Sequence, residues 1–146
     1  MKIIFSKELV EQMMSHSLET YPYECCGFIF GEDHIDGRKI TEVHKASNSK
    51  EGDQRRRFEI DPLEYLKAER YALANDLTLV GIYHSHPDHP AVPSEHDLKQ
   101  AVPFFSYIIL SVEKDEVKNI SSWQLDKNHR FKEENIVVEN KIETIK

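Results

Sequence analysis

The sequence predicts an α/β fold, specifically a single-domain α/β sandwich in which a mixed β-sheet is flanked by helices. The first observation behind this prediction is that segments with helical periodicity alternate with short segments rich in β-branched and aromatic residues. The second is size and composition, since 146 residues that are 39% hydrophobic and 31% charged can bury one core without a second domain.

A short strand and a helix are expected first. Residues 2–5 are apolar enough for a strand, and Ser6 is a typical helix N-cap. Apolar residues that include Leu9 and Met13 then recur at helical spacing until Pro22 ends the pattern. The methionines of this helix are therefore expected in the core.

A β-hairpin should follow the helix. Residues 26–31 and 39–46 have the composition of strands, and Asp36-Gly37 between them is a hairpin turn signal. Residues 58–60 are expected to pair onto the same sheet. The intervening segment is polar and ends in three arginines, Arg55 to Arg57, which favours a solvated loop. The alternative is a basic patch at the rim of a site, where it contacts the C-terminal segment or an acidic face of a protein substrate.

A second helix is predicted from Asp61 to about Asn75. Asp61 is a favourable N-cap, and Pro62 suits the first helical position because its missing N–H has no partner there anyway. Four apolar residues of this helix are expected to face the sheet: Leu63, Leu66, Ala72 and Leu73.

Three strands and a short helix complete the expected order. Residues 77–83 form an apolar, β-branched run that reads as a buried strand. A loop at residues 88–93 then leads to Ser94, the N-cap of a short helix. Residues 105–112 and 117–125 are predicted to form the last two strands.

The strongest chemical signal follows the buried strand at residues 77–83. His84 and His86 are two residues apart, so they share one face of a strand and both imidazoles can reach one cation. Asp97 falls at the third position of the helix capped by Ser94, where its carboxylate can turn back toward the strand. Two histidines and one aspartate leave the fourth position of a tetrahedral zinc open for water, which indicates a catalytic site.

Other histidines and the two cysteines are rival candidates for the site. His89 is expected at the rim of the cleft, and His96 should point away because it is rotated by about 100° from Asp97 on the helix. The remaining histidines lack a partner spacing. Cys25 and Cys26 are adjacent, so they read as reduced thiols at a strand start, and a nucleophilic Cys25 is the less favoured alternative.

The motif His84-Ser85-His86-Pro87, six residues, Ser94, two residues and Asp97 resembles the metal motif of the JAB1/MPN/Mov34 (JAMM) metalloenzymes. Pro22-Tyr23-Glu24-Cys25-Cys26-Gly27 is similar to the second, distant part of that motif. The resemblance covers residues 2 to about 123. We therefore expect a metalloprotease domain in residues 1–125 and a C-terminal tail in residues 126–146 that is partly strand or disordered.

The resemblance implies an MPN/JAB domain, which is cytidine-deaminase-like in fold, and a role for each motif residue. Zn²⁺ would be held by His84, His86 and Asp97, and Glu24 would take a proton from water and give it to the leaving amine. Ser94 would donate a hydrogen bond to the oxyanion of the tetrahedral intermediate. Spacing alone does not identify Glu24.

The substrate that the resemblance implies is a ubiquitin-like or sulfur-carrier protein of the β-grasp type, cleaved at a peptide or isopeptide bond after its C-terminal segment. Only six residues separate Pro87 from Ser94, so this chain looks like the compact prokaryotic members. The alternatives are a general zinc peptidase acting on short peptides and a non-catalytic MPN scaffold. Oligomeric state stays open.

Several function classes are disfavoured. The formal net charge of −7 and a single short basic cluster argue against a nucleic-acid partner. A zinc deaminase would need His-x-Glu and Pro-Cys-x-x-Cys, which are absent from the sequence. No apolar segment approaches the length of a signal peptide core or a membrane span, so we expect a cytoplasmic protein with no membrane partner.

Overall fold

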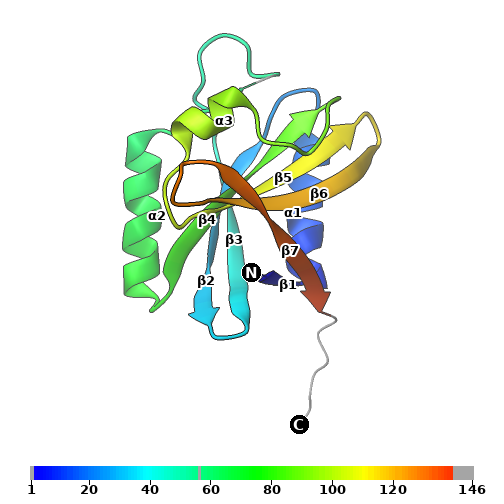
Figure 1. The fold of residues 1–146 in the computed structure, drawn as a ribbon. Helices are drawn as coiled ribbons and strands as arrows, with labels where there is room; N and C mark the ends of the chain where they lie inside the picture. The colour runs from blue at the N-terminus through cyan, green and yellow to red at the C-terminus, as the bar shows by residue number, and fades with distance from the viewer. Residues whose placement is uncertain (1, 56, 140–146) are drawn as a thin grey trace.

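The computed structural model describes residues 2–55 and 57–139, which form seven strands and three helices. Figure 1 shows their arrangement. In chain order the elements are β1 (Lys2–Ser6), α1 (Lys7–Thr20), β2 (Cys26–His34), β3 (Gly37–Ala46), α2 (Pro62–Ala74), β4 (Thr78–Pro87), α3 (Glu95–Gln100), β5 (Ser106–Glu113), β6 (Glu116–Leu125) and β7 (Phe131–Glu139). In this described part, no helix combines the length and apolarity needed to cross a membrane.

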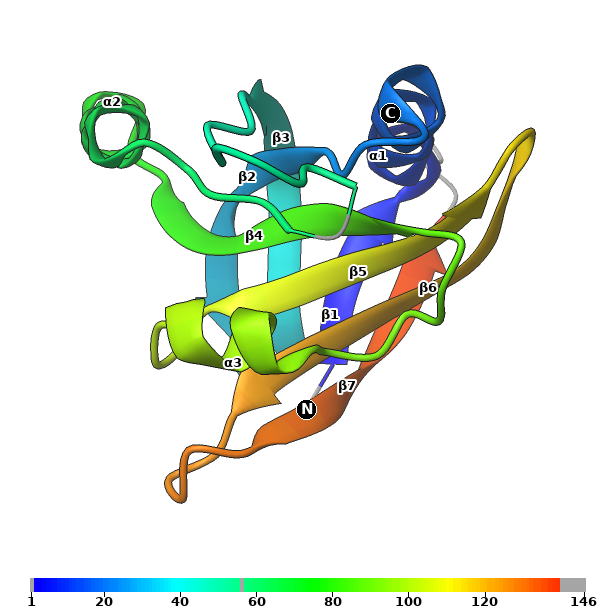
Figure 2. The ribbon, with the colours of Figure 1, turned by 90° about the horizontal axis from the view of Figure 1, so that it is seen from above.

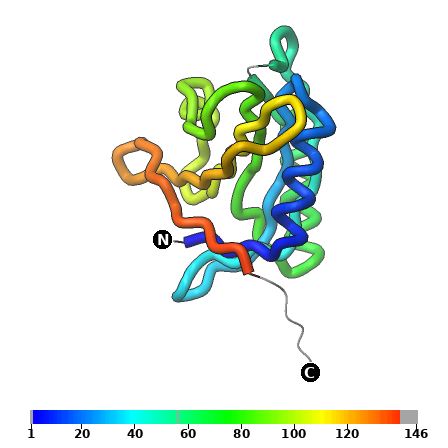
Figure 3. Tube along the Cα trace, turned by 90° about the vertical axis from the view of Figure 1, so that its right-hand side faces the viewer, coloured from blue at the N-terminus to red at the C-terminus, as the bar shows by residue number. Residues whose placement is uncertain are grey.

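The seven strands form one mixed sheet in the order β1-β3-β2-β4-β5-β6-β7. The pairs β1–β3, β1–β7 and β4–β5 are parallel, and the other neighbours are antiparallel. Because β1 pairs with both β3 and β7, the sheet closes into a barrel, and β1 and β7 lie side by side in Figure 3. The predicted α/β fold with a mixed sheet flanked by helices is confirmed.

The buried hydrophobic residues form two clusters, because alternate residues of each strand point to opposite faces of the sheet. Leu9 and Met13 of α1 pack with Ile29 and Tyr83, whereas Ala68 and Ala72 of α2 pack with their strand neighbours Phe28 and Ile82. Successive strand residues point to opposite faces, so α1 and α2 cover different faces of the sheet. Figure 2 shows the two helices on either side of β2 and β3. Strand β4 is therefore buried on both faces, as its apolar run predicts.

The prediction of which residues of α2 face the sheet is wrong. Leu63, Leu66 and Leu73 are exposed, at 57%, 40% and 84%, and only Ala72 of the expected four is buried. The helix packs through Ala68 and Ala72 because these small side chains let its axis approach the aromatic residues of β2. The leucines are left on the outer face.

Residues 58–60 do not form the expected strand. Their pattern alternates as a strand would, since Phe58 and Ile60 are buried and Glu59 is exposed. The backbone of Glu59, however, is bonded to the preceding loop: its N–H donates to Asn48 Oδ1, and its carbonyl accepts from the Ser49 N–H. This segment thus fills the core next to α2 without joining the sheet.

Candidate active site

Strand β4 carries His84 and His86 to one side of the sheet, next to α3. Both side chains are 1% exposed, and they lie on the same face because they are two residues apart on the strand. The ring of Phe58 stacks on His84 with 4.5 Å between ring centroids. Burial lowers the pKa of His84 and outweighs the opposing effect of the Asp97 charge, so this imidazole is held neutral, the form that binds metals.

Helix α3 delivers the third residue through its N-cap. The Asp97 N–H donates to Ser94 Oγ at 3.1 Å, and the Ser94 N–H donates back to Asp97 Oδ2 at 2.8 Å, which forms a capping box. This reciprocal pair turns the Asp97 carboxylate toward β4. The sequence prediction that Ser94 caps a helix with Asp97 at its third position is confirmed.

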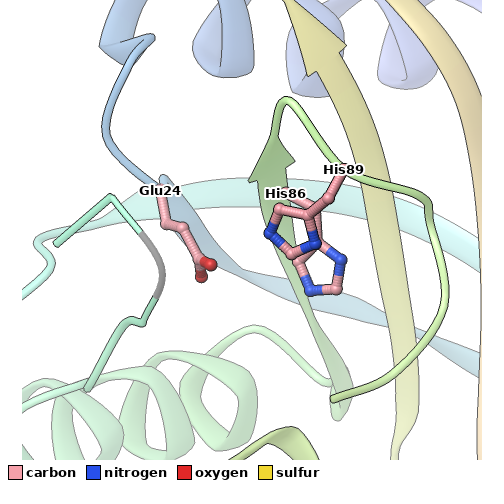
Figure 4. Close-up of side chains that lie close together, drawn as sticks. All are labelled: Glu24, His86 and His89. Carbon is pink, nitrogen blue, oxygen red and sulfur yellow. The ribbon is translucent and has the colours of Figure 1, made fainter. Parts of the chain in front are cut away.

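Three potential ligand atoms meet at nearly equal distances. His84 Nε2 lies 3.2 Å from His86 Nε2 and 3.2 Å from Asp97 Oδ1, and His86 Nε2 lies 3.2 Å from Asp97 Oδ2. A tetrahedral zinc with bonds of about 2.0 to 2.1 Å places its ligand atoms about 3.3 Å apart, so this triangle fits such an ion. Figure 4 shows where His86 lies at this end of β4.

The protonation of the set also suits a cation. His86 Nδ1 lies 2.8 Å from the Pro90 carbonyl oxygen, so Nδ1–H donates to that carbonyl and Nε2 is the nitrogen left to bind a cation. Burial by itself raises the pKa of Asp97, but His84, His86 and the Ser94 N–H outweigh it and hold that pKa well below its usual range. A neutral imidazole, a lone pair and a carboxylate at one point form the donor set of a divalent metal.

Glu24 lies across from these residues, just before β2. It is 3% exposed, its N–H donates to the Gln54 carbonyl at 2.7 Å, and its carbonyl accepts from Asn48 Nδ2 at 3.2 Å. The next residue, Cys25, donates its N–H to Ser85 Oγ at 2.8 Å. Ser85 lies between the two histidines, so the segment that carries Glu24 is fixed directly to β4.

The surroundings of Glu24 favour its protonated form in the absence of a metal. Burial, followed by the charges of Asp97 and Asp53, raises the pKa of Glu24 to about 9. A cation at the His84–His86–Asp97 triangle would oppose this shift, because it favours the charged carboxylate. Glu24 is thus a carboxyl group whose proton affinity depends on the charge a few ångströms away.

His89 is closer to the chemistry than the sequence suggests. Its ring stacks on that of His86 with centroids 4.3 Å apart and an interplanar angle of 18°. Ligand atoms of Glu24, His86 and His89 also lie within 4.8 Å of one another, and Figure 4 shows the Glu24 carboxylate directed toward the two rings. His96 instead points away, with Nε2 3.2 Å from the Phe58 carbonyl, as expected.

Comparisons with known proteins bear on this arrangement. Residues 6–126 match the family model described as prokaryotic homologs of the JAB domain. The chain is 35% identical over 116 residues to the desampylase of Pyrococcus furiosus, covering 80% of this chain and 76% of the relative. It belongs to the JAB/MPN family of JAMM-type metalloproteases.

Further relatives agree with this membership. The chain is 31% identical over 106 residues to the probable TtuB-protein conjugate cleaving protease of Thermus thermophilus, covering 72% of this chain and 67% of the relative. A solved structure from Desulfitobacterium hafniense superposes with a TM-score of 0.83 at 30% identity, covering 98% of this chain and 96% of that one. The resemblance stated from the motifs is confirmed.

Sequence reasoning on this JAMM protein missed some residues around the site. Asn48 and Gln54 hold Glu24 through its backbone, and Phe58 covers His84. Neither Asn48 nor Gln54 stands out in the sequence of a polar loop, because its contact with Glu24 depends on how that loop folds. Ser85 could have been found from the sequence, because it lies between two histidines that face inward, and a small hydroxyl there can form a hydrogen bond to the neighbouring segment.

Proposed function

We propose that this protein is a zinc metallopeptidase that hydrolyses the bond after the C-terminal segment of a ubiquitin-like or sulfur-carrier protein. The observation that carries the proposal is the triangle of His84, His86 and Asp97, with ligand atoms 3.2 Å apart, beside the buried carboxyl of Glu24. A zinc ion held by the triangle supplies a Lewis acid that lowers the pKa of water toward neutrality and polarises a carbonyl.

Side chains of the protein carry out the proton transfers, stabilise the oxyanion and orient the proposed ligands. Glu24 accepts the proton of the attacking water and donates it to the amine as the C–N bond breaks. Ser94 Oγ accepts the Asp97 N–H, so its own hydrogen is left to donate to the oxyanion. The capping box and the Pro90 carbonyl keep Asp97 and His86 oriented throughout.

The substrate class is supported by the relatives. One is named a desampylase and another a probable protease that cleaves TtuB-protein conjugates. The loop between β4 and α3 is short in this chain, so a slender terminal segment fits beside the ligands better than a folded surface does. The buried free thiols of Cys25 and Cys26 suit the reducing cytoplasm, where we place the protein.

The test is cleavage of a β-grasp carrier that is extended beyond its terminal Gly-Gly. Mass analysis should show hydrolysis after the Gly-Gly, and either a chelator or Glu24→Gln should abolish it. A general peptidase would instead cut short unstructured peptides at rates that do not change when the carrier is attached. A scaffold would cut neither.

A further inference from the structure

Glu24, His86 and His89 form a second group of potential ligands beside the triangle of proposed zinc ligands. Their ligand atoms lie within 4.8 Å of one another, and Figure 4 shows the Glu24 carboxylate directed toward the two rings. In the part of the chain that the structure describes, this group and the triangle are the two sets of three such side chains that could hold a metal ion. Carboxylate oxygen and imidazole nitrogen are both good zinc ligands, so the second group is a candidate site for an ion of its own.

The second group should bind zinc more weakly than the triangle does. The ligand atoms of the triangle lie 3.2 Å apart, which fits a tetrahedral zinc as it stands. The two sets share His86, whose Nε2 faces the triangle and whose Nδ1 lies 2.8 Å from the Pro90 carbonyl oxygen. Once an ion fills the triangle, Glu24 and His89 are the protein ligands of this group left for a second ion. Two protein ligands hold zinc less tightly than three, so the triangle fills first.

A cleft of about 690 Å³ gives a cation access to His89, which is one of its lining residues. The described lining carries three exposed charged side chains, two of them carboxylates: Asp53, Asp88 and Arg55. Arg56 lies outside the described residues. The negative charge of Asp53 extends to Glu24, where it helps to raise the pKa of that carboxyl. Carboxylates at the cleft and at Glu24 therefore favour the approach of a cation.

Both potential ligands come from backbone that is already held in place. Ser111 Oγ donates to the His89 carbonyl at 2.7 Å, and the Asp88 N–H donates to a carbonyl of β5 at 2.7 Å. The ring of His89 stacks on that of His86 with 4.3 Å between centroids. Glu24 is likewise fixed through its own N–H and carbonyl. An ion between Glu24 and His89 would thus require little ordering of the chain.

We propose that Glu24 and His89 bind a second zinc ion, more weakly than the triangle binds the first, and that this second ion inhibits hydrolysis. The inhibition rests on the proposed function, whereas the binding does not. A carboxylate bound to a cation is a much poorer proton acceptor, so the second ion would remove the base of the reaction. It would also fill the place beside Glu24 that the leaving amine must reach. Water completes its coordination.

Equilibrium dialysis of the full-length protein against rising concentrations of free zinc tests the binding. The wild type should take up one zinc per chain first and a second at higher free zinc. His89→Phe keeps a ring to stack on His86 but has no ligand atom, and Glu24→Gln removes the carboxylate. Each variant should keep the first zinc and weaken the second at least about 10-fold, since even groups that only orient a metal ligand contribute about 10- to 100-fold to affinity. His34→Phe is the matched control, because His34 is exposed at the far end of β2, and it should bind both ions.

The inhibition is measured with a β-grasp carrier that is extended beyond its terminal Gly-Gly. The rate in excess zinc is divided by the rate of the same variant with one zinc per chain, so a change in basal rate does not enter. Excess zinc should inhibit the wild type and His34→Phe, and the zinc concentration for half inhibition should rise at least about 10-fold in His89→Phe. Mg²⁺ at the same concentrations should not inhibit, because it prefers oxygen ligands and keeps several of its waters.

Three results would overturn the inference while leaving the proposed function intact. They are a wild type that never takes up a second zinc, a second zinc that binds His89→Phe or Glu24→Gln as tightly as the wild type, and inhibition that is equal in His89→Phe and the wild type or equal for zinc and Mg²⁺. If the protein with one zinc per chain does not cleave the carrier, the proposed function fails and inhibition has no meaning. The dialysis still decides whether Glu24 and His89 bind a second ion.

Discussion

At the residue scale, two buried carboxyl groups in one site have their pKa values moved in opposite directions. Burial, Asp97 and Asp53 raise the pKa of Glu24, whereas the two imidazoles and a backbone N–H keep Asp97 ionised despite its burial. Such a separation assigns different roles to the members of a pair. Asp97 is suited to stay charged as a ligand, and Glu24 is suited to exchange a proton.

Replacing Glu24 by Gln should separate the two roles. We expect Glu24→Gln to retain zinc and fold yet to lose hydrolysis by a factor of about 100 to 10,000, because only the proton carrier is removed. Elemental analysis and carrier cleavage measure the two quantities. Loss of zinc from this variant would make Glu24 a ligand and contradict the assignment.

The raised pKa of Glu24 also predicts a pH dependence in the metal-free protein. A group whose pKa is higher in the folded state contributes stability that is present below its unfolded value of 4.5 and lost as pH rises toward about 9. The metal-free wild type should therefore lose at most about 1.4 kcal/mol per pH unit in this window relative to Glu24→Gln. Urea unfolding of both proteins at pH 4.5, 7 and 9 measures it. Parallel profiles would mean that the pKa is not raised.

The hydroxyl of Ser94 has two separable uses. As an oxyanion donor it should account for about 3 to 4 kcal/mol of transition-state stabilisation, whereas as an N-cap alone it should contribute about 1 kcal/mol to folding. We expect the loss of kcat to dominate in Ser94→Ala. Asp61→Ala at the start of α2 is the matched control, since it removes a cap outside the site. A lower melting temperature with unchanged turnover would contradict the catalytic role.

The site could be predicted from sequence where local geometry determines it. The two-residue spacing of His84 and His86 predicts that they share a strand face, and the three-residue spacing of Ser94 and Asp97 predicts the capping box. The structure brings the ligand atoms of the histidines and the aspartate together. The contact of His89 with His86 could not be predicted this way. The position of His89 depends on how the loop after Pro87 folds, which involves carbonyls bonded by Ser111 and Ser121 from two distant strands.

At the element scale, the order of helices and strands agrees closely with the sequence prediction, but the buried face of α2 does not. The caps Ser6, Asp61 and Ser94 all lie where residue type predicts. The prediction of the buried face of α2 was wrong because hydrophobicity alone favours leucine over alanine as the buried residue. Close approach of the helix to aromatic residues of the sheet instead favours small side chains. Two alanines of α2 are buried at that contact, and three leucines are exposed.

Paired substitutions on α2 test this orientation. Ala68→Leu should destabilise the protein by about 1 to 3 kcal/mol, because it forces extra methylenes between α2 and β2. Leu73→Gln should stay within about 0.5 kcal/mol, since Leu73 is 84% exposed. Denaturant unfolding compares the two. The reverse ranking would mean that α2 packs through its leucines.

At the scale of the whole molecule, the candidate metal site of His84, His86 and Asp97 is assembled from segments that are separate in the sequence. Strand β4 supplies two of the proposed ligands, α3 supplies the third, and the segment just before β2 supplies Glu24. An ion bound to the folded triangle stabilises the fold by mass action, by about 4 kcal/mol at a thousand times its Kd. Metal content and stability are therefore linked.

Purified protein should contain about one zinc per chain and should melt at a lower temperature after chelation. In the double variant His84→Ala, His86→Ala, both the zinc and the effect of the chelator should disappear. His34→Ala is the control, because His34 is an exposed histidine far along β2. Full zinc occupancy in the double variant would place the metal elsewhere.

The parallel pairing of β1 with β7 has a consequence for how the chain is made. Lys2 pairs with Asn135, so the barrel closes through residues from opposite ends of the folded chain. A ribosome releases β1 long before β7, and during that interval the outer edges of β1 and β6 have no partner strand. Unpaired edges are where nascent chains capture one another. Translation of the last strand is thus the step that ends the period of greatest aggregation risk, and such long-range closure is slow.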